Sequence, residues 1–173
     1  MKIPMHKRLI LLTADINFGK TTALMRWVSS RDNVGGFLTP DVEGSRKIFF
    51  IRDKEYIAFQ ILDDAFPIEE IIEVGRFKFL RSGFARMHEM LLKDMSSECD
   101  VVIIDELGKL ELREEGLCNS IHQALEVFRK PDNKSSLVIV VREFLLAEAR
   151  EKFDLKGAEV YELRQDRIFD PGL

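Results

Sequence analysis

Three short runs of consecutive apolar residues indicate strands that are buried on both faces of a sheet. The runs lie within residues 8–13, 99–106 and 137–141, and Leu, Ile and Val dominate each of them. Strands at the centre of a parallel sheet show such unbroken apolar runs because helices cover both of their faces. The pattern therefore predicts an α/β fold with a mostly parallel sheet.

Apolar positions that recur every three or four residues predict the helices of this fold. Such stripes cover residues 82–96 and 114–128, and helix-compatible segments cover residues 22–28 and 147–153. Each stripe places its apolar side chains on one face of a helix, which can then pack on a sheet. Residues 159–163 are expected to form a final short strand.

The segment between the first two buried runs predicts additions to the sheet. Residues 35–42 contain a short strand that leads into a Thr-Pro-Asp loop, where an α/β sheet tends to place its ligands. Residues 47–52 and 56–62 are rich in Phe and Ile and flank a short polar turn, which predicts a β-hairpin. Residues 63–79 leave two interpretations open, either one helical turn or an irregular approach to a strand.

Composition describes an ordinary globular protein with enough residues for one domain. The chain has 173 residues, of which 46% are apolar and 32% charged, and its formal net charge is −4. A chain of this length builds one full core but is too short for two ordinary domains, so residues 1–173 are expected to form a single domain. The mild acidity argues against a nucleic-acid-binding surface as the main function.

The cysteine pattern and the N-terminus indicate a cytoplasmic protein with no membrane partner. Cys99 and Cys118 are too few and too far apart for a disulfide framework or a Cys-x-x-Cys metal site, which favours a reducing compartment. The apolar run near the N-terminus stops at Asp15 and is too short for a signal peptide. No stretch approaches the roughly 18 apolar residues that span a bilayer.

The first buried run leads directly into a phosphate-binding motif. Residues 14–21 have the pattern A-x-x-x-x-G-K-T, which is the P-loop with Ala in place of its first Gly. In such a loop Lys20 reaches the β- and γ-phosphates, the Thr21 hydroxyl binds Mg²⁺, and the helix N-terminus faces the same anion. The nucleotide-binding residues predicted by the motif are Ala14, Asp15, Ile16, Asn17, Phe18, Gly19, Lys20, Thr21 and Thr22.

Two residues in the loop differ from the usual glycines, and each has a physical account. Ala14 fits the first position if its φ stays negative. Asn17 stands where many P-loops have a second Gly, and Asn tolerates a left-handed backbone. The alternative is that Gly19 and Lys20 only begin a helix with an exposed Lys, but the buried strand before them and the helix after them favour the P-loop.

A second motif ends the apolar run of residues 99–106. Four β-branched residues are followed by Asp105 and Glu106, which is the Walker B pattern. The carboxyl end of this strand should lie beside the P-loop, so that Asp105 binds Mg²⁺ and Glu106 orients and deprotonates the attacking water. The alternative is that the two acids only begin a solvated loop.

Arg142 follows the third apolar run and has two interpretations. It stands at the carboxyl end of that strand, from where its guanidinium could face the γ-phosphate. An Arg at such a position more often makes a surface ion pair. Both interpretations stay open at the level of sequence.

Four short motifs, taken together, resemble the small P-loop nucleoside-triphosphatase family. They occupy residues 19–22, 36–41, 74–77 and 104–112, and the last of them, Ile-Asp-Glu-Leu-Gly-Lys-Leu-Glu-Leu, goes beyond general P-loop features. The resemblance implies a three-layer P-loop α/β sandwich with an added β-hairpin. It also implies Mg²⁺-dependent hydrolysis of nucleoside triphosphates, ATP and GTP among them, with loose base selectivity. By the same resemblance, Asp166-Arg167 stands in for an Asn-Arg pair and Arg167 contacts the base.

One departure from the family pattern concerns positive charge near the phosphates. Glu43 occupies a position where the family usually has Arg. An arginine at the transferred phosphoryl group is worth roughly 10³ to 10⁵ in rate. Arg46 is close enough in sequence to take over this role.

Three functions are consistent with these motifs. The first is a nucleoside triphosphatase with Lys20 and Glu106 as its catalytic residues. The second is a kinase for a nucleotide or another small molecule, although the segment after Pro131 is too short for the usual lid. The third is a nucleotide-binding regulatory module whose altered loop hydrolyses slowly. The preferred nucleotide and the oligomeric state are not indicated by the sequence.

Overall fold

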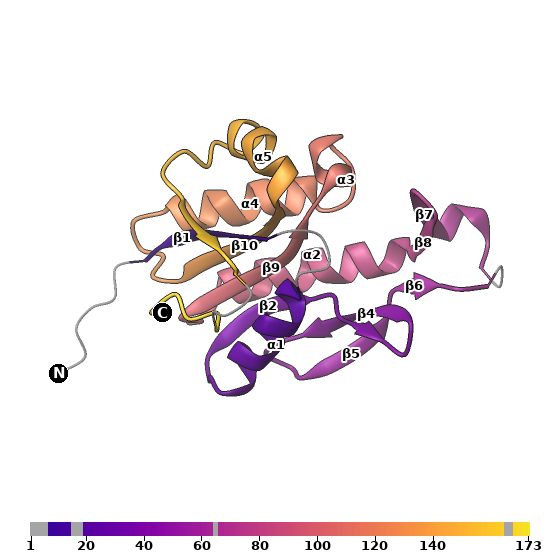
Figure 1. The fold of residues 1–173 in the computed structure, drawn as a ribbon, viewed down its shortest axis with the longest axis horizontal. Coiled ribbons are helices and arrows are strands. Elements are labelled where there is room, and N and C mark those ends of the chain that lie inside the picture. Colours follow the sequence, from indigo (N-terminus) through magenta and orange to yellow (C-terminus); the bar gives the residue numbers. More distant parts are fainter. Residues whose placement is uncertain (1–6, 15–18, 64–65, 165–167) are drawn as a thin grey trace.

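A mostly parallel sheet organises the chain in the computed structural model, which describes residues 7–14, 19–63, 66–164 and 168–173 (Figure 1). The described residues form eight strands in one sheet, in the order β11-β1-β10-β9-β2-β4-β3, with β5 paired to β4. These strands are β1 (Leu9–Ala14), β2 (Val34–Leu38), β3 (Asp41–Val42), β4 (Ser45–Phe50), β5 (Glu55–Ala58), β9 (Val101–Leu107), β10 (Ser136–Arg142) and β11 (Glu159–Glu162).

The five strands from β11 to β2 are parallel, and their register brings three carboxyl ends together. Strand β10 lies between β1 and β9. Ala14 at the end of β1 is opposite Arg142 at the end of β10, and Leu107 of β9 is opposite Val141 of β10. The predicted parallel α/β sheet is confirmed, and the P-loop strand and the Walker B strand end at the same edge.

Helices cover both faces of the sheet because alternate residues of each strand point to opposite faces. Leu11, Val102 and Leu137 belong to one core cluster, together with residues of α2 (Arg81–Met95), α4 (Cys118–Arg129) and α5 (Leu146–Lys152). Leu12 and Val138 belong to a second cluster with residues of α1 (Lys20–Ser29). The three-layer sandwich predicted from the motifs is confirmed. Among the described residues, no helix is long and apolar enough to cross a membrane.

The helix predicted over residues 114–128 begins four residues later than predicted, because the preceding residues form a turn. Glu114 and Gly116 both have positive φ, 66° and 55°, which a helix cannot contain. Helix α4 therefore starts at Cys118, and a four-residue helix, α3 (Lys109–Leu112), precedes the turn. The helix predicted at 147–153 corresponds to α5, which a short 3₁₀ turn, η2 (Glu143–Leu145), introduces.

The predicted hairpin is present, but its second strand is shorter than expected. Ile48 of β4 is opposite Ile57 of β5, and Phe49 is opposite Tyr56. The prediction extended the second strand to residue 62, whereas β5 ends at Ala58. The next residue, Phe59, is buried, and the chain leaves the main sheet there to enter a second one.

The second sheet protrudes at one end of the molecule, at the right of Figure 1. Its three strands, in the order β6-β8-β7, are β6 (Gln60–Ile61), β7 (Ile71–Val74) and β8 (Phe77–Leu80), with a 3₁₀ turn, η1 (Ile68–Glu70), before β7. The Phe59 ring lies 4.6 Å from that of Phe79 and 5.0 Å from that of Phe84, centroid to centroid. These contacts attach the sheet to α2. The segment that the sequence left open thus contains both a helical turn and strands.

Candidate functional site

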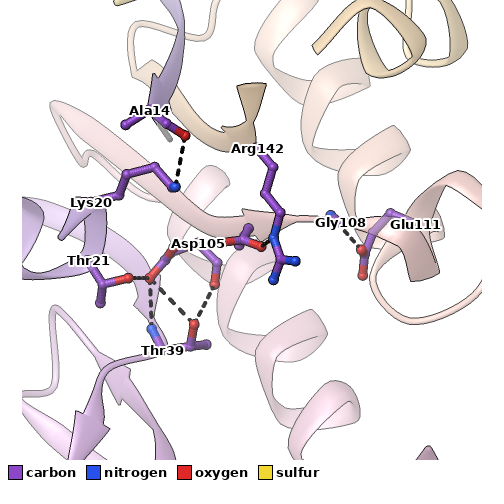
Figure 2. A network of polar contacts seen from close by, with 9 residues as sticks. Ala14, Lys20, Thr21, Thr39, Asp105, Gly108, Glu111 and Arg142 are labelled. Atoms are coloured by element: carbon purple, nitrogen blue, oxygen red, sulfur yellow. Dashed lines mark hydrogen bonds and ion pairs between the residues drawn. The ribbon is translucent and has the colours of Figure 1, made fainter. Parts of the chain in front are cut away.

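Polar side chains from α1, β9 and β10 and the last carbonyl group of β1 meet at the carboxyl edge of the parallel sheet (Figure 2). Lys20 is the first residue of α1, and its side chain is buried. Its Nζ donates a hydrogen bond to the Ala14 carbonyl oxygen at 3.2 Å. Gly19 caps the helix with φ +76°, a backbone conformation that favours glycine, and its carbonyl oxygen accepts from the Ala23 N–H.

Five predicted nucleotide-binding residues of the P-loop motif have a described position. Ala14 ends β1 with a negative φ, as its methyl group requires. Thr21 is half-buried and Thr22 is exposed on the first turn of α1. The predicted ligands that lie outside the described residues are Asp15, Ile16, Asn17, Phe18 and Arg167.

Asp105 joins the two motifs in space. Its side chain is 1% exposed, and its Oδ2 accepts hydrogen bonds from the Thr21 hydroxyl at 2.9 Å and from the Thr39 backbone N–H at 3.0 Å. The Thr39 hydroxyl lies 3.4 Å from the Asp105 carbonyl oxygen and completes the contact (Figure 2). Residues 21 and 105 lie 84 positions apart in sequence, so this contact depends entirely on the sheet topology.

Burial makes the carboxyl group of Asp105 less acidic than usual. Desolvation raises its pKa to about 6, and the neighbouring charge of Glu106 acts in the same direction. The Thr39 N–H, the Thr21 hydroxyl and the positive charge of Arg46 oppose this shift. The hydrogen bonds and the positive charge around Asp105 therefore do not fully offset the cost of burying its ionised carboxylate.

Glu106 and Arg142 form an ion pair beside Asp105. The Arg142 Nε donates to the Glu106 Oε1 at 2.5 Å, and the side chains are 34% and 19% exposed, respectively. Arg142 reaches Glu106 because β10 lies between the P-loop strand and the Walker B strand. The Arg142 guanidinium thus makes an ion pair, as one of the two interpretations of the sequence predicted. Its partner is Glu106, the predicted catalytic base.

Comparison with known proteins identifies the family. The sequence profile of a family described as NTPase matches residues 9–171. The chain belongs to this NTPase family. Its nucleotide is therefore expected at the edge that carries Lys20 and Asp105, which is where P-loop proteins bind phosphates.

Two solved structures share the fold of this NTPase-family chain. THEP1 from the hyperthermophile Aquifex aeolicus is 22% identical, with a TM-score of 0.67 and 91% of each chain covered. A human cancer-related nucleoside triphosphatase is 21% identical, with a TM-score of 0.66, and the match covers 92% of this chain and 90% of that one. A search of curated proteins gives no match. The family resemblance noted in the sequence is confirmed.

The site of this NTPase has the oxygen atoms that Mg²⁺ prefers. The Asp105 Oδ1 is buried and has no hydrogen-bond partner among the described residues, and the Thr21 hydroxyl contacts the other oxygen of the same carboxylate. Mg²⁺ takes one or two carboxylates from a protein and completes its shell with water and phosphate oxygens. No cluster of three His, Cys, Asp or Glu side chains suited to a metal occurs in the described part of the chain. Thr21 and Asp105 therefore fit a Mg²⁺ ion that takes its other ligands from a nucleotide and from water.

A buried carboxylate, that of Glu111, holds the loop after β9. In the sequence this residue stands out only as part of the motif at residues 104–112. Glu111 is 4% exposed, and its two oxygens accept hydrogen bonds from the N–H groups of Gly108 at 2.9 Å and Leu117 at 3.1 Å. Burial raises its pKa. A Cβ at Gly116 would lie 2.5 Å from the Glu111 Oε1, so the turn needs glycine there. The signal in the sequence was an acid three residues after a helix-start glycine.

Thr39 and Arg46 also belong to the site. The sequence indicated Arg46 as a replacement for the Arg that the family usually has at position 43, whereas the role of Thr39 required the structure. Thr39 lies in the Thr-Pro-Asp loop after β2, where the sequence predicted a ligand-side loop but no partner. Arg46 of β4 lines the same cavity as Asp105 and Glu106. Thr39 directly follows β2, and Arg46 lies on β4. The pairing of β2 with both β9 and β4 sets the position of the two residues relative to β9.

Proposed function

We propose that the protein is a Mg²⁺-dependent nucleoside triphosphatase that hydrolyses ATP and GTP to the diphosphate and phosphate. The contact between the Thr21 hydroxyl and the Asp105 carboxylate carries this proposal. It joins the two motifs that divide phosphate binding and metal binding between them in P-loop proteins. Membership of the NTPase family supports the same substrate class.

Phosphate binding is assigned to the start of α1. Lys20 gives up its hydrogen bond to the Ala14 carbonyl and turns to the β- and γ-phosphates, a short movement for a flexible side chain. The amide groups at the N-terminus of the helix add partial positive charge. Thr21 and Asp105 would hold Mg²⁺, which would supply positive charge to neutralise the phosphates of the nucleotide.

Activation of the attacking water is assigned to Glu106. One carboxylate oxygen of Glu106 is fixed by Arg142, which leaves the other free to orient water and accept its proton. The water oxygen bonds to the γ-phosphorus while the bond to the β–γ bridging oxygen breaks, so that the diphosphate leaves. Arg142 is a positioning residue in this scheme, because it acts through Glu106.

Phosphate release from ATP and GTP, with and without Mg²⁺, tests the proposal on the wild type, Lys20→Ala and Glu106→Gln. We expect Glu106→Gln to bind nucleotide normally and to lose turnover by roughly 10² to 10⁴, the usual contribution of a general base. Lys20→Ala should lose nucleotide affinity as well. Glu115→Gln is the matched control, since this exposed carboxylate lies in the connection between β9 and α4 and does not line the cavity beside Glu106.

Two results would contradict the assignment. Turnover that survives in Glu106→Gln would remove Glu106 as the base. Nucleotide binding with negligible phosphate release by the wild type would favour the regulatory module over the hydrolase. A third function, phosphoryl transfer to a second substrate, is favoured by a cavity that Glu106 lines.

A further inference from the structure

A cavity of about 130 Å³ adjoins the proposed catalytic carboxylate. Asp105 and Glu106 line one end of it, and the other end lies under the small β6-β8-β7 sheet and against α2. Because Asp105 also contacts Thr21 of the P-loop, the polar end of the cavity is separated from the phosphate-binding helix by a single side chain. The cavity therefore lies beside the carboxylates that join the Walker B strand to the P-loop helix.

The walls of the cavity suit a flat apolar group. Phe59, Phe79 and Phe84 contribute aromatic rings. The other apolar residues of the lining are Val74, Met87, Leu110 and Leu117. An engineered cavity of about 150 Å³ lined by Leu, Ile and Phe binds benzene, so a volume of this order accommodates one ring. The small sheet supplies two of these residues, Val74 from β7 and Phe79 from β8.

The charged end of the cavity suits a phosphoryl group that is being transferred. Arg142 is paired with Glu106. Arg46 lines the cavity, and its guanidinium makes no hydrogen bond or ion pair with any residue that the structure describes. Its charge acts on Asp105 at a distance. Positive charge at this position stabilises the equatorial oxygens of a phosphoryl group that moves from a nucleotide toward the cavity.

We propose that the cavity binds a second substrate, a small alcohol that carries one flat apolar ring, and that the protein transfers the γ-phosphoryl group to it. Glu106 accepts the hydroxyl proton, the alcohol oxygen bonds to the γ-phosphorus, and the bond to the β–γ bridging oxygen breaks. The products are a phosphate monoester and the nucleoside diphosphate. This inference rests on the proposed nucleotide site, and hydrolysis is the outcome when water occupies the place of the alcohol.

The short segment after Pro131 does not exclude this activity. It lies in the connection from α4 to β10, away from the cavity. The residues between β5 and α2 form an insertion that lines the cavity with Phe59, Val74 and Phe79. The proposed acceptor site therefore needs no lid after α4.

Benzyl alcohol is a suitable probe because it joins one ring to a primary hydroxyl. The full-length protein is incubated with ATP, Mg²⁺ and benzyl alcohol, and phosphorus NMR measures benzyl phosphate and free phosphate in the same sample. We expect benzyl phosphate to form in proportion to the alcohol concentration. Saturation-transfer NMR of benzyl alcohol without nucleotide should show binding to the protein.

Two substitutions on one strand test the site of binding. Val74→Trp fills the cavity and should lower the ratio of benzyl phosphate to free phosphate at least about tenfold, as expected for a blocked pocket. Ile71→Trp is the matched control, because side chains three apart on a strand point to opposite faces and Ile71 does not line the cavity. It should leave both products unchanged.

The possible failures are distinguishable. Phosphate release without benzyl phosphate overturns the transfer and leaves the proposed triphosphatase intact. Equal ratios in Val74→Trp and the wild type overturn the assignment to this cavity. The absence of both products, with Mg²⁺ and ATP present, overturns the proposed function and the transfer together.

Discussion

The Asp105 carboxylate occupies a place that suits a metal ligand better than a structural residue. It is buried, its Oδ1 has no hydrogen-bond partner in the described part of the chain, and its pKa is raised to about 6. Buried carboxylates of structural importance are usually fully hydrogen-bonded. A buried carboxylate oxygen that has no hydrogen-bond partner, next to a threonine hydroxyl and a P-loop, is suited to binding a cation.

The raised pKa of Asp105 gives a pH-dependent prediction for stability. The native state binds this proton more tightly than the unfolded chain, whose Asp has a pKa of about 3.9, so ionisation costs stability progressively as the pH rises from about 4 through about 6. In Asp105→Asn this cost is absent. We expect the wild type to lose about 1 to 3 kcal/mol of unfolding free energy relative to Asp105→Asn between about pH 4 and about pH 8. Urea unfolding at both pH values measures it.

Activity provides the control for this variant. Asp105→Asn should release no phosphate from ATP even where it is the more stable protein, since Asn binds Mg²⁺ far less strongly than a carboxylate does. A stability difference that is the same at both pH values would show that Asp105 does not titrate in this range. Full activity in Asp105→Asn would remove the residue from the metal site.

At the scale of elements, the connection from β9 to α4 is organised by one side chain. Glu111 accepts hydrogen bonds from Gly108 and Leu117, which lie at the two ends of this connection. Gly108 follows Glu106 by two residues. The carboxylate of Glu111 therefore fixes the backbone on which the proposed base is mounted.

Removing this carboxylate should loosen the loop and slow the chemistry. Glu111→Ala leaves two N–H groups without an acceptor, and we expect a loss of about 2 to 4 kcal/mol of unfolding free energy, since hydrogen bonds to buried charged groups are strong. Turnover should fall while nucleotide affinity stays, because Lys20 and Thr21 lie on another element. Glu115→Ala, at an exposed position, serves as the control. Equal stability of the two variants would contradict the role of Glu111.

At the scale of the whole molecule, the C-terminal segment packs on the helix that begins the nucleotide site. Phe169 is 1% exposed, and its ring lies edge-on to Trp27 of α1 at 5.5 Å and to Tyr161 of β11 at 5.2 Å. The Arg31 guanidinium lies over the Trp27 ring, 4.1 Å from its centroid, and pairs with Asp170. The orientation of α1 thus depends on residues at the far end of the chain.

Removal of the Phe169 ring should destabilise the whole protein. Phe169→Ala leaves a cavity against α1, and we expect a loss of about 3 to 5 kcal/mol, the usual cost of removing a buried Phe. Thermal unfolding measures the loss. Trp27 is the single tryptophan of the chain, so its fluorescence should shift to the red as water reaches the ring. Ile168→Ala, at an 87% exposed neighbour, should change neither quantity.

Local patterns predicted the elements well wherever one physical cause dominated. The apolar runs of β1, β9 and β10 are continuous because helices bury both faces of these strands, and the two motifs follow them directly. The start of α4 was misplaced because the predicted helix began at Glu114, three residues before its apolar stripe, whereas Glu114 has a positive φ in the turn around Glu111. The small sheet could not be assigned because its strands are only two to four residues long.

The sequence by itself determined the α/β class, the strand ends that carry Lys20 and Asp105, and the family to which the chain belongs, because each follows from contiguous residues. Only the tertiary structure decided that Arg142 pairs with Glu106, that Thr39 holds Asp105, and that an aromatic cavity opens beside them. These contacts join residues from separate strands. Strand order and register set such distances, and neither is written in any local pattern of residues.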